Sequence, residues 1–253
     1  MKAQALLELL FPSTIYCISC KSLIDKSRPY ALCDSCMRMF HWANGRTCEK
    51  CGKLLQEDYP HDICADCREA GHCFDKGYAC VEYGIYERDM LLSFKYGGKT
   101  FIGEKIAQMM ADRLESEHLE ADVMIPVPMN RKKQKKRGFN QAEIIASRLA
   151  KKLSLPYSAG LLKRTGNTAA MSKLTPEERR MNIENAFKVP EMAIGHIAGK
   201  RILLVDDIYT TGSTMDACSR ALKEAGASEV RFVAFASGAN LLIWDKAAAQ
   251  ACG

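Results

Sequence analysis

The sequence contains no run of apolar residues close to the roughly 20 that a membrane-spanning helix needs. The opening MKAQALLELLF is apolar, but Glu8 interrupts it and no small-residue cleavage site follows, so it is not typical of a secretion signal. The composition is 47% hydrophobic and 26% charged, which excludes a disordered chain. We therefore expect a cytoplasmic protein of one large or two small domains, without membrane insertion.

Cysteine, in contrast, is abundant: of 12 cysteines, eight form four Cys-x2-Cys pairs before residue 70. Twelve residues separate the first pair from the second, and twelve separate the third from the fourth, so the unit C-x2-C-x12-C-x2-C occurs twice. Four sulfur ligands complete a tetrahedral structural zinc site, and a reducing compartment favours metal over disulfides. The predicted ligands of two structural Zn²⁺ ions are Cys17, Cys20, Cys33, Cys36, Cys48, Cys51, Cys64 and Cys67.

The spacing leaves open which pairs share an ion. Eleven residues separate Cys36 from Cys48, so a site built from the second and third pairs is an alternative. We expect none of the nearby histidines (His41, His61 and His72) to replace a cysteine. Eight thiolates on two zinc ions add four negative charges, which lowers the formal net charge from +6 to +2. Overall charge therefore gives little support to nucleic-acid binding, and any basic function has to be local.

Beyond about residue 76, apolar runs typical of strands alternate with helical patterns. This alternation predicts a parallel sheet that binds ligands at the carboxyl ends of its strands. The expected strands are 79–83, 122–127, 200–205 and 230–236; the expected helices are 102–118, 140–153 with Asn140 as its cap, one starting at a capping box at 175–178, and 214–225. We expect a small cysteine-rich domain over 1–75, an α/β domain over 76–240 and a tail over 241–253.

The strand over 200–205 is followed by two adjacent acids, Asp206 and Asp207. Neighbouring carboxylates at a strand end are costly unless a positive or hydroxyl-bearing group meets them. The hydroxyl-rich loop 210–214 then leads into a helix N-terminus, whose free N–H groups and dipole suit a phosphate. One ligand with vicinal hydroxyls and a phosphate would satisfy both features, and a ribose 5-phosphate unit fits.

The run LLVDDIYTTGST resembles the phosphoribosyl diphosphate signature of type I phosphoribosyltransferases. Together with RGFNQ at 137–141 and the doubled cysteine unit, residues 15–236 resemble the ComF family of competence-associated proteins. The resemblance implies a type I phosphoribosyltransferase-like parallel sheet with an N-terminal small zinc-ribbon domain. It implies that Asp206 and Asp207 bind the ribose hydroxyls as catalytic residues, and that Mg²⁺ accompanies the diphosphate. The residues predicted for substrate binding are Tyr209, Thr210, Thr211, Gly212, Ser213, Thr214, Arg137, Gly138 and Arg179.

Other segments of this resemblance concern the diphosphate and the second substrate. Six of the seven residues over 131–137 are basic, and cations near the sheet edge would offset the charge of a diphosphate. A solvated basic loop and a nucleic-acid contact are the alternatives for this run. Segment 164–187, which contains Arg179, matches a family pattern and is expected to cover the site. Met171 stands where glutamine is frequent in the family, and methionine cannot make the same hydrogen bonds.

Three functional hypotheses follow. In the first, the protein binds phosphoribosyl diphosphate with Mg²⁺, in connection with competence, DNA uptake or nucleotide metabolism. If it is a phosphoribosyltransferase, an incoming base or amine is the nucleophile and the site stabilises the leaving diphosphate. In the second, a non-catalytic module uses the ribbons and the basic run to contact single-stranded DNA or competence proteins, although only Phe139 lies nearby to stack on bases. In the third, the ribbons only stabilise the α/β domain or bind a protein partner.

Overall fold

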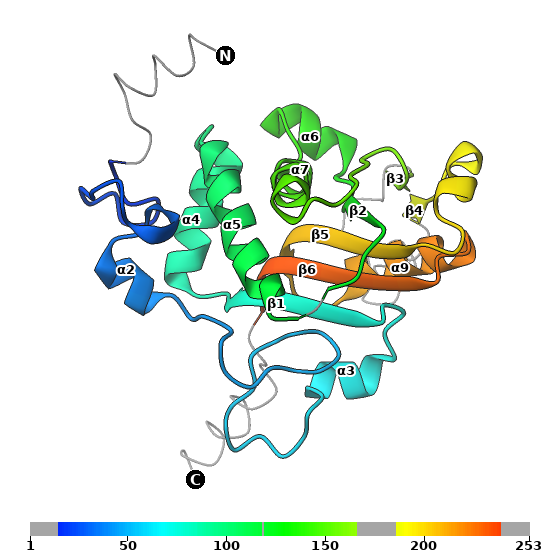
Figure 1. Cartoon of the computed structure of the whole chain (residues 1–253), viewed down its shortest axis with the longest axis horizontal. Helices are drawn as coiled ribbons and strands as arrows, with labels where there is room; N and C mark the ends of the chain where they lie inside the picture. Colours follow the sequence, from blue (N-terminus) through cyan, green and yellow to red (C-terminus); the bar gives the residue numbers. More distant parts are fainter. Residues whose placement is uncertain (1–14, 118, 166–185, 239–253) are drawn as a thin grey trace.

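The structure is a computed structural model that describes residues 15–117, 119–165 and 186–238. A four-stranded parallel sheet with the strand order β1-β6-β5-β2 lies at its centre (Figure 1). The strands are β1 (Lys76–Glu82), β2 (Val123–Pro126), β5 (Arg201–Tyr209) and β6 (Glu229–Ser237). Because all four are parallel, their carboxyl ends share one edge of the sheet, and the predicted α/β fold is confirmed.

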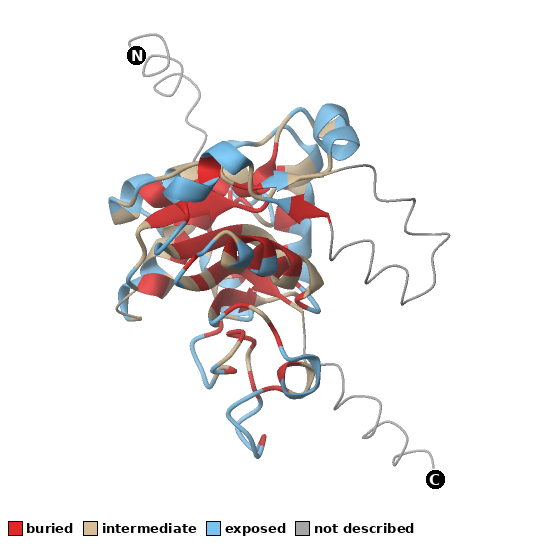
Figure 2. Ribbon diagram, turned by 90° about the vertical axis from the view of Figure 1, so that its right-hand side faces the viewer, coloured by how far each residue is buried: buried red, intermediate tan, exposed pale blue. Residues whose placement is uncertain are grey.

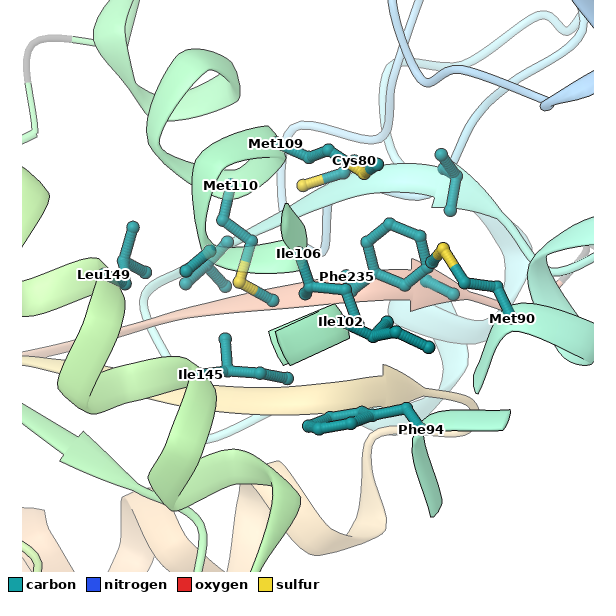
Figure 3. Packing of buried hydrophobic residues seen from close by; sticks show 14 of the residues in the cluster. Cys80, Met90, Phe94, Ile102, Ile106, Met109, Met110, Ile145, Leu149 and Phe235 are labelled. Carbon is teal, nitrogen blue, oxygen red and sulfur yellow. The ribbon is translucent and has the colours of Figure 1, made fainter. Parts of the chain in front are cut away.

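Helices cover both faces of the sheet, with α4, α5 and α7 on one face and α9 on the other. Side chains of β5 alternate between the two faces, so that Leu203 joins one hydrophobic cluster and Leu204 the other. Figure 3 shows the first cluster, in which Ile106, Ile145 and Phe235 are fully buried. The helices are α4 (Ile85–Tyr96), α5 (Phe101–Glu115), α6 (Arg131–Arg137), α7 (Gln141–Leu153) and α9 (Ser213–Glu224).

The strand predicted to end at residue 205 is longer than expected. β5 continues to Tyr209, because Ile208 and Tyr209 stay in register with Ala236 and Ser237 of β6. Asp206 and Asp207 therefore lie within the paired part of β5, near its carboxyl end, rather than after the strand. The prediction of this boundary was wrong. Acidic residues are rare in strands and indicate a strand end, and the sequence does not show the pairing with β6 that extends the strand.

Two α-helices of the described part of the α/β domain were not predicted. Helix α4 lies between β1 and α5, and the basic run 131–137 forms helix α6. The run is therefore a helix and not a loop, although residues 131–136 are exposed, as the alternative of a solvated run expected. The side chain of Asn130 accepts hydrogen bonds from the N–H groups of Lys132 and Lys133, and Gly138 ends the helix with a φ of 87°. The expected helix 140–153 and its Asn140 cap are confirmed. The capping box at 175–178, Met171, Arg179 and the tail 241–253 lie outside the described residues.

The cysteine-rich region consists of two modules that repeat after 31 residues. Isolated bridges join Tyr16 to Leu23 in the first module (residues 16–39) and Thr47 to Leu54 in the second module (residues 47–70). Each module ends in a short helix, α2 (Asp34–Met39) or α3 (Ala65–Ala70). In Figure 1 the first module lies beside α4 and α5, and the second lies below β1.

Shorter elements complete the fold: η1 (Pro29–Ala31), η3 (Glu191–His196) and the antiparallel pair β3 (Lys163–Arg164) and β4 (Phe187–Lys188). Figure 2 shows that buried residues concentrate in the sheet and the helix faces turned toward it. Within the described ranges, every helix is too short or too polar to cross a membrane.

Candidate functional site

Each cysteine module gathers its four sulfur atoms at one point. The Sγ atoms of Cys17, Cys20, Cys33 and Cys36 lie within 4.8 Å of one another, and so do those of Cys48, Cys51, Cys64 and Cys67. The first pair therefore joins the second and the third joins the fourth, and the alternative of a site from the second and third pairs is wrong. The residues of both groups are the eight predicted ligands.

The sulfur geometry fits zinc and not disulfides. The Sγ atoms of Cys51 and Cys64 are 3.7 Å apart, whereas a disulfide bond is about 2.05 Å long. The backbone N–H of Cys64 donates to Cys48 Sγ at 3.2 Å, a contact that favours a thiolate. Hydrogen bonds from Cys51, Cys64 and Cys67 hold the pKa of Cys48 well below its usual value. Four such sulfur ligands leave no open position, so Zn²⁺ would be structural here.

Neither sulfur group includes a histidine, as expected from the sequence. His41 and His72 instead contact acids in the α/β region. His41 lies 3.4 Å from Glu87, and His72 lies 2.6 Å from Asp216.

The two predicted catalytic acids sit at the carboxyl edge of the sheet, near the end of β5. Asp207 forms an ion pair with Lys95 of α4, and both side chains are largely buried. The backbone N–H of Asp207 donates to Asp206 Oδ1 at 2.8 Å. Burial, with the neighbouring charge of Asp207, raises the pKa of the Asp206 carboxyl well above its usual value. The positive group that the paired acids require is therefore Lys95, which comes from a helix the sequence did not predict.

The phosphate loop, residues 210–214, connects β5 to α9 directly beside these acids. Gly212 takes a φ of 87° and caps α9, and its carbonyl accepts from Asp216 N at 2.8 Å. Across the described ranges, no backbone acceptor meets the N–H groups of Gly212, Ser213 or Thr214. The hydroxyls of Thr211 and Ser213 lie 3.1 Å apart. Free donors and hydroxyls at a helix N-terminus form an arrangement that can hold an anion.

Arg137 and Gly138, at the end of α6, reach the acids through the last turn of α4. The Arg137 guanidinium lies 4.9 Å from the centre of the Tyr96 ring and donates to Tyr96 Oη at 3.1 Å. Tyr96 directly follows Lys95, the partner of Asp207, so the end of α4 links the acids to α6. The other five basic side chains of α6 are exposed, and none forms an ion pair with a described residue.

Tyr209 lies beneath the phosphate loop and is only 2% exposed. Its ring stacks on Phe232 at 4.7 Å, and Lys53 Nζ lies 5.6 Å from the ring centre. Burial, with the nearby sulfur atoms of the second module, raises the pKa of Tyr209 far above its usual value. The predicted contact of Tyr209 with a substrate stays a prediction.

The structure thus brings Asp206, Asp207 and the phosphate loop together, and it links them to Arg137 through α4. The position of Arg179 is outside the described residues. The family resemblance of Lys95-Tyr96-Gly97 places this segment near the ligand, but sequence reasoning missed the ion pair of Lys95 with Asp207 and the role of His72. For the histidine, the sequence did contain a signal. His41 and His72 each follow the last cysteine of their unit by five residues.

Comparison with known proteins adds two family models. Residues 101–248 match the phosphoribosyl transferase domain, which is more than half of the chain, and residues 6–68 match the double zinc ribbon domain.

Two curated relatives span more than four fifths of the chain, and others match about half of it. Competence protein F of Haemophilus influenzae is 27% identical over 85% of this chain and 93% of its own length. Competence protein ComFC of Streptococcus pneumoniae is 28% identical over 83% of this chain and 89% of its own length. DNA utilization protein YhgH of Escherichia coli O157:H7 is 33% identical over 44% of this chain and 47% of its own. Among solved structures, glutamine phosphoribosylpyrophosphate amidotransferase of B. subtilis is 21% identical with a TM-score of 0.40, over 56% of this chain and 30% of that one.

Proposed function

Because the chain belongs to the phosphoribosyl transferase domain family and, with its double zinc ribbon, to the competence-associated ComF family, we propose that it binds phosphoribosyl diphosphate with Mg²⁺. The observation that carries the proposal is the adjacency of two acids and an open phosphate loop at one edge of the sheet. Asp207 is held by Lys95, and Gly212 begins the helix that follows. A ribose 5-phosphate unit combines vicinal hydroxyls with a phosphate and satisfies both features.

The ligand would lie along this edge in a defined direction. The ribose hydroxyls donate to Asp206 and Asp207, and the free N–H groups and hydroxyls of the phosphate loop donate to the 5-phosphate. Lys95 and Arg137 lie toward α4 and α6, where positive charge offsets the diphosphate. If the site turns over, a base or amine attacks the anomeric carbon while the bond to the diphosphate oxygen breaks, and the diphosphate leaves with the bonding electron pair.

The donor set at this edge fits a magnesium ion that is shared with the substrate. Across the described ranges, groups of three or more closely placed metal-ligating side chains occur only in the two cysteine modules. The edge itself offers two carboxylates, one of which is already paired with Lys95. Mg²⁺ commonly keeps waters and takes oxygens from substrate phosphates, so Asp206 and Asp207 would supply at most a minority of its ligands. The ion would neutralise charge on the diphosphate.

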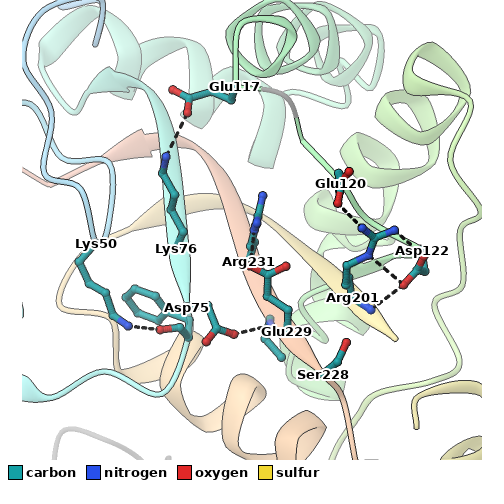
Figure 4. Close-up of polar contacts among 12 residues, drawn as sticks. Lys50, Asp75, Lys76, Glu117, Glu120, Asp122, Arg201, Ser228, Glu229 and Arg231 are labelled. Carbon is teal, nitrogen blue, oxygen red and sulfur yellow. Dashed lines mark hydrogen bonds and ion pairs between the residues drawn. The ribbon is translucent and has the colours of Figure 1, made fainter. Parts of the chain in front are cut away.

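Calorimetric titration of phosphoribosyl diphosphate with and without Mg²⁺ tests the proposal. Each charge-assisted hydrogen bond contributes about 1.5–3 kcal/mol, so Asp206→Asn combined with Asp207→Asn is expected to weaken binding by roughly 100-fold or more. The matched control is Asp122→Asn. Asp122 pairs with Arg201 at 3.1 Å at the opposite, amino end of β5 (Figure 4), so its replacement should leave the affinity within about twofold. Unchanged binding heat in the double variant contradicts the proposal.

The single variant Asp206→Asn keeps the ion pair between Asp207 and Lys95 and therefore separates loss of binding from unfolding. The folded pKa of Asp206 lies above its usual value of 3.8, so ionisation of this carboxyl lowers stability as the pH rises above that value. Asn cannot ionise, and Asp206→Asn is therefore expected to raise the melting temperature at pH 7. A lower melting temperature would show that the carboxylate is stabilised by contacts other than those described.

A second candidate function, contact with single-stranded DNA, is favoured by one observation: the five exposed basic side chains of α6. Such a contact releases counterions, so the logarithm of affinity should fall steeply with the logarithm of salt concentration. Replacing Lys132, Lys133, Lys135 and Lys136 by Gln should flatten that slope by about three units. An unchanged slope removes α6 from this role. For both functions we propose a cytoplasmic location, because thiolate ligands persist in a reducing compartment.

A further inference from the structure

The short segment between the second module and the sheet lies against the phosphate loop. Gly71 ends α3 in the left-handed conformation, and the chain then turns so that the side chain of His72 is fully buried. His72 Nδ1 lies 2.6 Å from Asp216 Oδ2, and Cys73 N donates to Asp216 Oδ1 at 2.9 Å. Both carboxylate oxygens of Asp216, in the first turn of α9, are therefore held by this segment.

The His72 ring also fixes the glycine of the phosphate loop. A Cβ atom on Gly212 would lie 2.6 Å from His72 Cε1 and 2.9 Å from Tyr209 Oη, so no side chain fits at this position without displacing the ring. The ring of Phe74 stacks on the imidazole, with 4.7 Å between the ring centres, and limits its movement. The left-handed backbone of Gly212 and the start of α9 are thus clamped by one side chain from outside the loop.

The second module contacts the same strand end at another point. Lys53 is 3% exposed, forms an ion pair with Asp66 at 2.5 Å, and places its ammonium over the ring of Tyr209. Asp66 lies between Cys64 and Cys67, two of the zinc ligands. The closed four-sulfur site is therefore joined to the base of the phosphate loop through Lys53 and Tyr209, and to its tip through His72.

The first module repeats this contact at a different helix. His41, the equivalent of His72 in the 31-residue repeat, has its Nδ1 2.8 Å from where a Cβ on Gly84 would lie. Gly84 caps α4, and Glu87 in the first turn of α4 accepts from His41 N at 2.8 Å. Each module thus places one histidine against a glycine cap and an acid at the start of a helix that reaches the site. The pairing of His41 is looser, because its side chain is 54% exposed.

We infer that His72 is a positioning residue that sets the shape of the phosphate loop and makes it depend on the second four-cysteine site. The inference rests on the proposed function only for the identity of the ligand; the clamp itself is a property of the unliganded chain. His41 provides an internal comparison, since it acts on α4 and not on the loop.

Amide hydrogen exchange on the full-length, zinc-loaded protein without ligand is the direct test. In His72→Asn, peptides covering 210–216 are expected to exchange about tenfold faster, while peptides covering 84–90 keep their rate. The matched variant His41→Asn should show the reverse pattern, with a smaller change. Zinc content should stay at two ions per chain in both. Loop exchange as slow in His72→Asn as in the wild type overturns the inference.

A second variant covers the case in which His72→Asn does not fold. Asp216→Asn keeps the size of the side chain but removes one charge-assisted hydrogen bond to the imidazole, so loop exchange should rise several-fold. If this folded variant exchanges like the wild type, the clamp has no effect on the loop and the inference is wrong.

Two small probes separate this inference from the proposed function. Ribose 5-phosphate reports on the phosphate loop, and inorganic diphosphate with Mg²⁺ reports on the opposite end of the site. His72→Asn should weaken ribose 5-phosphate about tenfold and leave diphosphate within twofold. Equal losses for both probes contradict a positioning role at the loop. If the wild type binds neither probe, the proposed function fails, while hydrogen exchange still decides the role of His72.

Discussion

The two cysteine modules share one spacing and one backbone path, yet they differ in how they are embedded. In the first module Cys20 is exposed and Cys33 half-buried, whereas all four cysteines of the second are buried. Ser22 O accepts from Cys17 N in the first module as Lys53 O accepts from Cys48 N in the second. Identical spacing therefore encodes the sulfur cage, and the surroundings of each cage decide how far water reaches it.

One position of the repeat shows this difference directly. Lys21 and Gly52 are equivalent, and both take a left-handed backbone, with φ values of 68° and 74°. At Gly52 a Cβ would lie 2.7 Å from Gly77 O and 2.8 Å from Tyr78 Cα, so β1 packs directly on this turn. Lys21 instead reaches back to donate to Ile18 O at 2.6 Å. Glycine is required where the module meets the sheet, and a side chain is tolerated where it does not.

The largest effect is expected from removing one ligand of each cage. Cys67→Ser leaves three buried sulfurs and opens the cage beneath Tyr209, which should cost several kcal/mol and lower the melting temperature by roughly 10 °C or more. Cys20→Ser removes an exposed ligand and should lower it by only a few degrees. Scanning calorimetry with zinc analysis measures the melting temperature and zinc content of both variants. Equal decreases in melting temperature would contradict the difference in embedding between the two modules.

Gly52→Ala is the next strongest change. The added Cβ meets the backbone of β1, which cannot move without disturbing its pairing with β6, so we expect a destabilisation of about 3 kcal/mol or more. Urea unfolding measures the free energy. A loss below about 1 kcal/mol would show that the module can move away from the sheet.

Lys53→Ala is expected to cost about 3 kcal/mol or slightly less. The substitution leaves Asp66 without its buried partner and exposes the face of Tyr209. The equivalent position in the first module is Ser22, which is exposed and whose hydroxyl lies 2.9 Å from Cys20 Sγ, so Ser22→Ala should change the unfolding free energy by less than about 1 kcal/mol. Similar values for the two variants would mean that Lys53 contributes no more than a surface residue.

The smallest effect is expected from Lys21→Gly. Glycine relieves the left-handed backbone but loses the hydrogen bond to Ile18 O, so stability should rise by no more than about 1 kcal/mol. Thermal melting of Lys21→Gly and Gly52→Ala compares the two turns. We expect the turn of the first module to accept lysine or glycine, and the turn of the second module to accept only glycine. A clear loss of stability in Lys21→Gly would show that the hydrogen bond outweighs the backbone cost.

The sequence predicted those features that local chemistry encodes. The cysteine cages follow from spacing, and the helix at 141 follows from the side chain of Asn140, which accepts from Ala142 N. The class of the sheet follows from alternating apolar runs. These need only contacts between neighbours in the chain, or a repeat that can be counted.

What the sequence did not predict depends on contacts between distant segments. Asp207 contacts Lys95 and His72 contacts Asp216, although the members of each pair are far apart in the sequence. The end of β5 was missed because its last residues are held by β6 and not by their own propensity. The equal spacing of His41 and His72 from the last cysteine of each unit can be counted in the sequence. The neighbouring residues, however, do not indicate that each histidine lies against a helix-capping glycine.

The strand order has a consequence for how the polypeptide is made. β6, the last described strand, lies between β1 and β5, so β1 gains its parallel neighbour in the sheet only after residues 229–237 have left the ribosome. Both cysteine cages are complete far earlier in synthesis. During translation the two cysteine modules can therefore bind metal while the sheet is still incomplete. One edge of β1 stays unpaired until β6 has been synthesised.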